Sequence, residues 1–179
     1  PHDKIRLKAL SSSINSQFAL VDEERFRKTC AQFATGIAIA TICGREGQPL
    51  GITVNSFTSV SCAPPLVLVC IDYRSSILPH FRNTTHYGIN VLSNDQRDVS
   101  VRFSQPELDR FVGLAWDAGA TGVPLLEGVL ASMECHITQT VEAGDHAIFL
   151  AEVVRAECGE GQPLLYFGSS YCSPAGSVK

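Results

Sequence analysis

The sequence lacks the runs of one charge and of apolar residues that mark several large classes of protein. Its 179 residues carry 14 Lys and Arg against 18 Asp and Glu, a formal charge of -4, and contain no long basic run. A nucleic acid or an anionic membrane is therefore a poor candidate for the main partner. No stretch reaches about 18 apolar residues, so the sequence predicts no membrane span. We expect a small molecule or another protein as the partner.

The sequence also contains no closely spaced cysteine pair, and we expect no secretory leader. The start, Pro1-His2-Asp3-Lys4, has no apolar stretch typical of a signal peptide. The seven cysteines are odd in number, form no C-x-x-C pair and mostly have apolar neighbours, as Cys70 does. This usage is typical of free thiols in a reducing compartment, and we expect a cytoplasmic protein. The five histidines do not cluster with cysteines at zinc-ligand spacing, so we predict no metal.

The common nucleotide-binding and esterase motifs are absent as well. The pair of glycines in Gly159-Glu160-Gly161 lacks the third glycine of a dinucleotide-binding fingerprint, and Pro163 disfavours a helix there. No phosphate-binding G-x-x-x-x-G-K-[ST] loop and no G-x-S-x-G elbow occurs. A dinucleotide, if one binds, must bind in another way.

The composition that is present suits one globular domain. With 45% apolar and 18% charged residues, the chain is long enough to bury a core without metal or disulfide support. Residues 1–20 mix charge with a serine run and indicate a flexible N-terminal arm. We expect residues 21–179 to form a single domain.

Three helices are predicted from capping residues and spacing. Asp22 is placed to cap a helix over residues 22–34. A short helix is expected to start near Ser75, and another is expected to begin at Asn94 and to end by Pro106. Helices are thus few and short.

Most of the remaining chain is predicted to be extended. Apolar or alternating runs predict strands at residues 37–43, 66–71, 87–92, 129–138, 146–156 and 163–167, with the polar segment from residue 51 returning as a hairpin partner. Residues 113–128 are rich in glycine and are expected to be irregular. Many strands with turns between them indicate a mainly β fold, a closed or nearly closed antiparallel barrel.

One segment carries most of the functional information. Residues 51–65 read GITVNSFTSVSCAPP, in which β-branched residues alternate with hydroxyl and amide groups before a Pro-Pro pair. An extended segment of this kind offers many donors and acceptors to a planar polar ligand. It resembles the G-x-T-x-N-S-F-x-S-V-S-x-x-P-P signature of the flavin reductase-like family, whose members bind FMN or FAD in a split β-barrel.

The resemblance continues in ordered blocks from about residue 25 to 171. The blocks are FATGI at 33–37, GINVL at 88–92 leading to Gln96, Arg102-Phe103, Trp116, PLLEG at 124–128, GDH at 144–146 and PLLYF at 163–167. Their order covers nearly the whole predicted domain. It implies a split β-barrel that is antiparallel and of the FMN-binding type.

The resemblance also implies a flavin site. Backbone and side-chain groups of one strand would line the flavin ring and ribityl chain, the end of the next strand would border the same groove, and Phe103 would pack beside the cofactor. Ser75 and Ser76, with Arg102, would hold the phosphate. The implied flavin-binding residues are Gly51, Ile52, Thr53, Asn55, Ser56, Cys70, Ile71, Asp72, Ser75, Ser76, Arg102 and Phe103.

A nicotinamide site is implied by the GDH block. His146 would lie beside the nicotinamide of NADH or NADPH and act in catalysis, and Tyr166, Phe167, Gly168 and Tyr171 would help to form the dinucleotide groove. The implied activity is hydride transfer from nicotinamide C4 to flavin N5, which needs close parallel rings but no protein nucleophile. The resemblance further implies a homodimer and a monooxygenase partner that receives the reduced flavin.

Three alternatives stay open from the sequence. The flavin could be tightly bound and reduce another acceptor, such as ferric iron. The protein could bind flavin without turnover, as a carrier or interaction module. It could also be a β-barrel that binds some other ligand. The residues do not decide between FMN and FAD or between NADH and NADPH.

Overall fold

The structure is a computed structural model that describes residues 20–106 and 109–174. The predicted arm at residues 1–20 lies outside the described residues except for Leu20. By its internal contacts the chain divides into two units, residues 1–33 and residues 34–179. Each is described by itself.

The first unit contains one described helix, α2 (Glu23–Cys30). As predicted, Asp22 is its N-cap, and Oδ1 accepts a hydrogen bond from the Arg25 backbone N at 2.8 Å. The helix ends earlier than the predicted range because residues 32 and 33 donate to carbonyls three residues back, at Thr29 and Cys30, which tightens the chain into a turn. None of its eight residues is buried.

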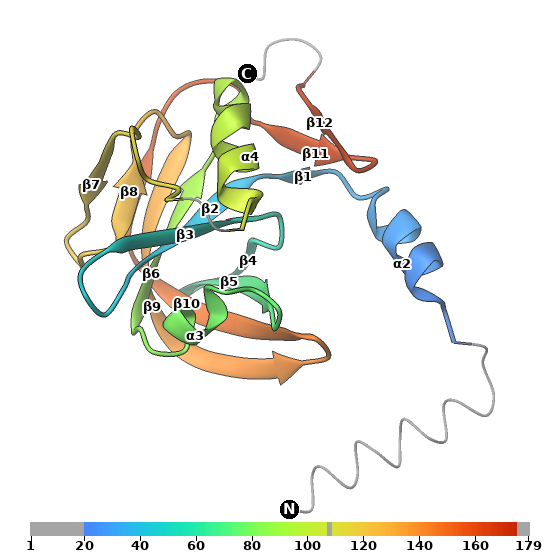
Figure 1. The fold of residues 1–179 in the computed structure, drawn as a ribbon, viewed down its shortest axis with the longest axis horizontal. Coiled ribbons are helices and arrows are strands. Elements are labelled where there is room, and N and C mark those ends of the chain that lie inside the picture. Colours follow the sequence, from blue (N-terminus) through green and yellow to red (C-terminus); the bar gives the residue numbers. More distant parts are fainter. Residues whose placement is uncertain (1–19, 107–108, 175–179) are drawn as a thin grey trace, which may run out of the picture. The chain divides into compact units, whose positions relative to one another are not determined.

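The second unit is built on a seven-stranded sheet (Figure 1). The strands run in the order β3-β2-β6-β9-β10-β5-β4, and every pairing is antiparallel. Their bounds are β2 (Ala38–Cys43), β3 (Pro49–Val54), β4 (Thr58–Cys62), β5 (Pro65–Asp72), β6 (His86–Val91), β9 (Ala131–Ala143) and β10 (His146–Cys158). The predicted mainly β, antiparallel fold is confirmed.

The sheet is split between β3 and β4, which form its two edges and do not pair with each other. Residues 55–57 carry the chain from one edge to the other. The segment 51–65 is therefore not one extended piece, as we expected, but the end of β3, a short link and β4. A link of this length spans at most about 14 Å from Val54 to Thr58, so these strand ends must lie near each other.

The remaining strands form two smaller sheets. β1 (Thr35–Gly36), β11 (Leu165–Phe167) and β12 (Ser170–Cys172) form one, and β7 (Trp116–Ala118) and β8 (Pro124–Leu126) form the other. The expectation of irregular chain at 113–128 is thus wrong, because this region holds a hairpin with Trp116 opposite Leu126. Strands of three residues are too short to show an alternating pattern.

The helices of the second unit differ in detail from the expectation. α3 (Leu78–Phe81) starts three residues after Ser75. A 3₁₀ turn, η1 (Asn94–Gln96), leads into α4 (Arg97–Ser104), and Ser93 rather than Asn94 is the cap, in a capping box with Gln96. Within residues 20–106 and 109–174, no helix combines the length and apolarity needed to cross a membrane.

β2 separates two apolar clusters and is buried on both faces. Ala38, Ala40 and Ile42 face a cluster inside the curved sheet, whereas Ile37 and Ile39 join a second cluster under α4. This double burial explains the continuous apolar run at 37–43.

The predicted alternation at 129–138 is confirmed in part. Cys135 is fully buried and His136 is exposed. Glu134, however, is only 3% exposed, although it shares the outer side of β9 with His136. Its carboxylate accepts hydrogen bonds from Ala120 and Thr121, which cover it.

Candidate functional site

Most of the predicted flavin residues lie on the edge strand β3 or next to it. Leu50, Ile52 and Val54 pack on the core, so the alternate residues Gly51 and Thr53 point to the other side. The Ile52 side chain is therefore turned away from the site, and only its backbone is available there. As an edge, β3 also presents backbone N–H and C=O groups with no strand partner.

Gly51 allows α4 to pack closely on β3. A Cβ at this position would lie 2.7 Å from Cε1 of Phe103. Phe103 is fully buried and makes an edge-to-face contact with Phe111 at 5.0 Å between ring centroids. Phe103 thus shapes the floor beneath β3 and does not itself face an open groove, which corrects its expected place beside a cofactor.

A cavity of about 580 Å³ opens at Gly51, and we call it the Gly51 cavity. This volume lies within the range of about 300–1,000 Å³ that is typical of cofactor and ligand sites. The cavity brings together parts of β3, the segment before α3 and the loop after α4. Its lining residues are Gln48, Pro49, Leu50, Gly51, Ser76, Ile77, His80, Asp109, Arg110, Phe111 and Val112.

Arg110 supplies positive charge to the Gly51 cavity. It is half-buried, its Nη1 donates to the Gly51 carbonyl, and its Nε and Nη2 donate to the Gln105 carbonyl at 3.0 and 2.7 Å. Burial lowers the pKa of Arg110 from its ordinary value, so desolvation opposes the charge. Among the described residues no carboxylate forms a salt bridge with it. An anion in the cavity would offset this cost.

A second cavity of about 380 Å³ lies along the same strand, and we call it the Asn55 cavity. Its lining joins four of the predicted residues, Thr53, Asn55, Tyr166 and Tyr171, to Ile37, Ser100 and Ser104. Thr53 Oγ1 donates to the Ser100 carbonyl at 2.6 Å, and the Ser100 hydroxyl lies 3.0 Å from the Tyr171 hydroxyl. Hydrogen bonds thus hold the walls of this cavity together.

The residues predicted at the end of the next strand have different environments. Ser56 Oγ accepts from the Cys70 backbone N at 3.0 Å and donates to the Cys70 carbonyl at 3.1 Å, so it ties the link between β3 and β4 to β5. Burial raises the pKa of the Cys70 thiol. Ile71 is 1% exposed and belongs to the core, so its side chain does not border a groove, contrary to expectation.

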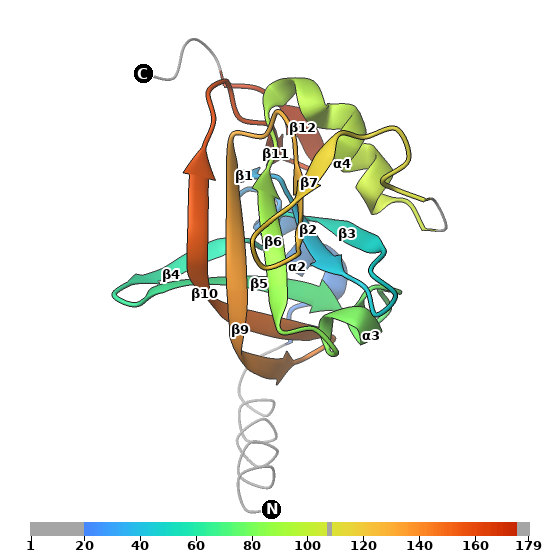
Figure 2. The same ribbon diagram turned by 90° about the vertical axis from the view of Figure 1, so that its left-hand side faces the viewer.

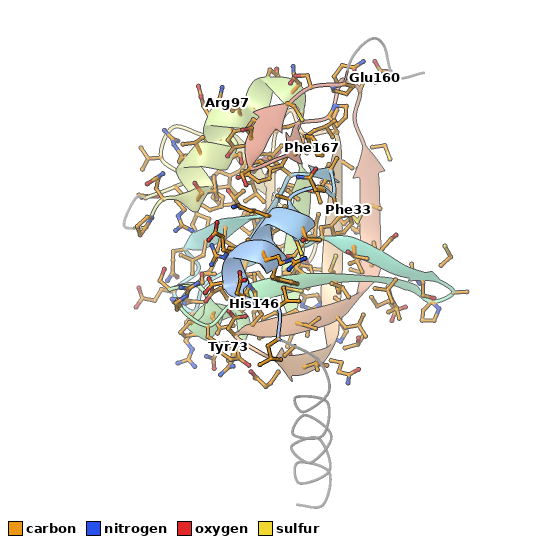
Figure 3. All side chains as sticks on the ribbon, turned by 90° about the vertical axis from the view of Figure 1, so that its right-hand side faces the viewer. Phe33, Tyr73, Arg97, His146, Glu160 and Phe167 are labelled. Carbon is orange, nitrogen blue, oxygen red and sulfur yellow. The ribbon has the colours of Figure 1, made fainter. Side chains whose placement is uncertain are left out.

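Asp72 ends β5 directly opposite His146, the first residue of β10. Hydrogen bonds from Arg74 hold the pKa of Asp72 well below its usual range. His146 Nδ1 donates to Asp145 Oδ1 at 2.6 Å, and this bond lowers the pKa of Asp145. The Tyr73 backbone N donates to the Asp145 carbonyl at 2.9 Å, which ties the chain after β5 to the residue before His146. Figure 3 labels Tyr73 and His146 in this region. The His146 Nε2 is therefore the nitrogen left for a ligand.

The structure does not bring the three predicted phosphate ligands together. Ser76 lines the Gly51 cavity, whereas Ser75 lines a separate cavity of about 670 Å³ with Tyr73, Leu78, Pro79, Arg82, Asn83 and Glu142. Arg102 Nη1 donates to the Val112 carbonyl at 2.7 Å and so supports the loop after α4. The cation at the Gly51 cavity is Arg110 instead.

The predicted dinucleotide residues lie on the β11–β12 hairpin. Tyr166 and Tyr171 pair across it, with an edge-to-face contact at 5.5 Å. Phe167 is 46% exposed, and Gly168 lies in the two-residue turn with Ser169. Of these four residues, the two tyrosines line the Asn55 cavity. The Phe167 and Gly168 roles stay predictions.

Reasoning from the sequence missed Arg110, Phe111 and His80. They belong to a loop and a four-residue helix, and no periodic pattern marks them. A single basic residue among polar neighbours is normally solvated, so Arg110 carries no signal of its own.

Comparison with known proteins identifies a common family across most of the chain. The Flavin reductase like domain matches residues 30–175. The reductase component of the flavin-dependent trigonelline monooxygenase of Acinetobacter baylyi is 40% identical over 151 residues, which cover 84% of this chain and 49% of that protein. The FMN reductase (NADH) SmoA of Agrobacterium fabrum is 42% identical over 146 residues, covering 82% of this chain and 83% of that protein.

Solved structures show the same likeness. The NADH:FAD oxidoreductase SgcE6 of Streptomyces globisporus, in complex with NAD and FAD fragments, aligns with a TM-score of 0.83 and 32% identity, over 90% of this chain and 100% of that one. The chain spans about half the length of some curated relatives, such as the Acinetobacter protein and a probable flavin reductase of Rhizobium meliloti (49% each).

Proposed function

The chain belongs to the flavin reductase like family, and from that premise we propose that it is an NAD(P)H-dependent flavin reductase. The enzyme transfers a hydride from reduced nicotinamide to N5 of FMN or FAD. The observation that carries this proposal is the Gly51 cavity, which opens on the family signature at an edge strand.

The residues of this cavity fit a flavin phosphate and ring. Arg110 offers a partly desolvated cation, and Ser76 offers a hydroxyl, at one site. The backbone groups of β3 that have no strand partner match the donors and acceptors along the edge of the flavin ring, although the Gly51 carbonyl is already engaged by Arg110. We therefore assign the phosphate to Arg110 and Ser76, with Arg102 holding the loop that carries Arg110. When bound, the flavin supplies the hydride acceptor, N5.

His146 is assigned to the nicotinamide. Asp145 engages its Nδ1, which fixes the ring and leaves Nε2 to hydrogen-bond the ligand. The segment from Asp72 to Ile77 begins opposite His146 and ends at the Gly51 cavity, so it connects the two proposed binding places. The role of the protein in this reaction is to bind and align the two rings.

The partners follow from the same proposal. Relatives are named as reductase components of monooxygenases that act on trigonelline and on 4-nitrophenol, and we propose that this chain likewise supplies reduced flavin to a monooxygenase. We propose a homodimer, as the resemblance implies. The described cysteines are all free thiols, which supports a cytoplasmic location.

The test is NADH and NADPH consumption by the purified protein with added FMN, FAD or riboflavin, after its visible spectrum is recorded. We expect turnover that saturates with added flavin and is lost when Arg110 is replaced by Gln. A yellow protein that is reduced once without turnover would favour a bound flavin that serves another acceptor, such as ferric iron. Flavin binding without any reduction would leave a flavin-binding module, and no flavin binding would refute the proposal.

A further inference from the structure

Two histidines face each other on adjacent central strands of the large sheet. His86 on β6 is paired in register with His136 on β9, and Figure 2 shows these strands side by side. The ring centroids are 4.8 Å apart, and His136 Nδ1 lies 3.3 Å from His86 Nε2. His86 is half-buried and His136 is exposed, so solvent reaches the pair. Neither residue lines the cavities described above.

The separation of the two nitrogens matches a metal chelate. At metal–nitrogen distances of about 2.0–2.1 Å, two neighbouring ligand nitrogens lie about 2.9 Å apart in a square-planar or octahedral site and about 3.3–3.4 Å apart in a tetrahedral one. His86 Nε2 and His136 Nδ1 are 3.3 Å apart, which is also the distance of a hydrogen bond between the two rings. An ion would replace the proton of that hydrogen bond and turn the two lone pairs toward itself, while the sheet already holds the two rings together.

Thr85 orients one of the rings. Its Oγ1 lies 2.9 Å from His86 Nδ1. When the hydroxyl accepts a hydrogen bond from Nδ1–H, the lone pair of Nε2 is directed at His136. Partners of this kind on the non-ligating nitrogen fix the tautomer of metal-binding histidines. His136 needs only its proton on Nε2 instead of Nδ1 to present a second lone pair.

The nearby carboxylates decide how many ligand positions of the metal ion the protein itself can fill. Glu152 is the residue of β10 opposite His136, so it is the next member of the same row across the sheet. Glu134 is occupied by hydrogen bonds from Thr121 and Ala120. In residues 20–106 and 109–174, no group of three or more His, Cys, Asp or Glu side chains has metal-binding geometry. Water must therefore fill the remaining ligand positions.

We propose that His86 and His136 form a two-nitrogen chelating site for a divalent late first-row transition metal ion. Imidazole is a preferred ligand of such ions, with affinity rising through cobalt and nickel to copper. An ion at this site would link β6 to β9, the third and fourth strands in the order of the sheet. Because it would bind the folded chain and not two distant histidines of an unfolded one, it would also stabilise the fold.

The probe is Ni²⁺, titrated by calorimetry into the full chain without an affinity tag. We expect one equivalent to bind, and we expect His86→Gln and His136→Gln each to weaken binding at least 10-fold. The double variant should bind no more weakly than either single variant, because losing one nitrogen already destroys the chelate. Ni²⁺ should raise the Tm of the unmodified chain but not that of the variants.

Thr138→Ala is the matched control, because Thr138 is exposed on the same side of β9 and offers no imidazole. It should keep full affinity, and circular dichroism checks that all variants fold. Exposed cysteines such as Cys43 and Cys158 could also take up metal, and the double variant measures that contribution. The proposal would be overturned if the single variants, or the double variant, bound Ni²⁺ as tightly as the unmodified chain does.

Discussion

His146 contributes to the proposed reaction through one ring nitrogen. Because Asp145 holds Nδ1, replacing His146 by Ala should remove a single ligand contact and leave the flavin site intact. We expect kcat/KM for NADH to fall about 10-fold, the effect of one hydrogen bond of about 1.4 kcal/mol, with the KM for flavin unchanged. Asp145→Asn should lower kcat/KM for NADH less, since the imidazole ring of His146 remains. Unchanged NADH oxidation in His146→Ala would show that the assignment is wrong.

Glu134 is the buried carboxylate that should make stability depend on pH. Burial alone would raise its pKa, but hydrogen bonds from Thr121 and Ala120 outweigh burial and hold the pKa of Glu134 below its ordinary value. A group whose folded pKa is depressed stabilises the fold above its unfolded pKa, about 4.3, and loses that contribution as the pH falls through the folded pKa. Glu134→Gln should therefore cost about 1–3 kcal/mol at pH 7.

Urea unfolding of Glu134→Gln between pH 7 and pH 3 provides the measurement. The difference from the unmodified chain should shrink below about pH 4. Glu142→Gln is the matched control, because Glu142 pairs with Arg82 at 2.8 Å but its side chain is 58% exposed. Exposed pairs contribute about 0–1 kcal/mol, so this variant should change little. A difference for Glu134→Gln that stays constant across the range would contradict the assignment.

Individual site residues were predictable only where they belong to an ordered motif. Thr53 and Asn55 were expected at the flavin, and Tyr166 and Tyr171 at the dinucleotide groove, and the four residues line one cavity. Arg110 was not expected, because its importance comes from the contact with the Gly51 carbonyl, 59 positions away. Such a contact depends on the path of the whole chain and leaves no mark on the local sequence.

At the level of elements, the contact between β3 and α4 depends on Gly51. An alanine there would place its Cβ within 2.7 Å of Phe103 and 3.3 Å of Ile39, in the middle of a packed cluster. We expect Gly51→Ala to cost about 1–3 kcal/mol in urea unfolding, as overpacking usually does. Adding Phe103→Leu should recover part of the loss, because the smaller side chain makes room. A double variant as unstable as the sum of the two single variants would refute this coupling.

The β11–β12 hairpin turns through two residues with positive φ. Gly168 has φ of 57° and Ser169 has φ of 63°, the backbone of a type I′ turn. Serine is strained in this region and glycine is not, although glycine gains entropy when the chain unfolds. We expect Ser169→Gly to stabilise the protein by about 0.5–1 kcal/mol. Ser170→Gly, which falls in β12, should instead destabilise it. Thermal unfolding of both variants measures the change in Tm, which should rise for Ser169→Gly and fall for Ser170→Gly.

The elements that the sequence did not predict are the shortest. β1 has two residues and β7, β8 and β12 have three each, whereas β11 lies within the strand predicted at 163–167. Periodicity needs at least four residues to be visible, so only their partners in space define these strands. The long strands β9 and β10, by contrast, were predicted from their apolar or alternating residues and from the turn residues between them.

For the whole molecule, the fold class followed from the number and spacing of strands, but the strand order did not. Pairing of β6 with β9 joins residues 50 positions apart, as His86 and His136 show. Nor does any local pattern mark residues 55–57 as a link between two sheet edges. The sheet is open between β3 and β4 and does not close into a barrel, and this opening beside the proposed flavin site is a property of the assembled chain.

The division of the chain at residue 33 leads to the last prediction. Both apolar clusters consist of residues from Ile37 onward, and the eight residues of α2 include none that is buried. A helix of this length is marginal by itself. A chain that begins at Ala34 should therefore unfold cooperatively, with a free energy within about 1 kcal/mol of the full chain.

Urea unfolding at two protein concentrations would measure this difference and separate folding from association, since a dimer's midpoint rises with concentration. A chain that begins at Val21 is the matched comparison, because it keeps α2 and starts where we expected the domain to start. If removing residues 21–33 cost more than about 2 kcal/mol at both concentrations, α2 would belong to the folded domain. A loss seen only at the lower concentration would instead assign this segment to the association of two chains.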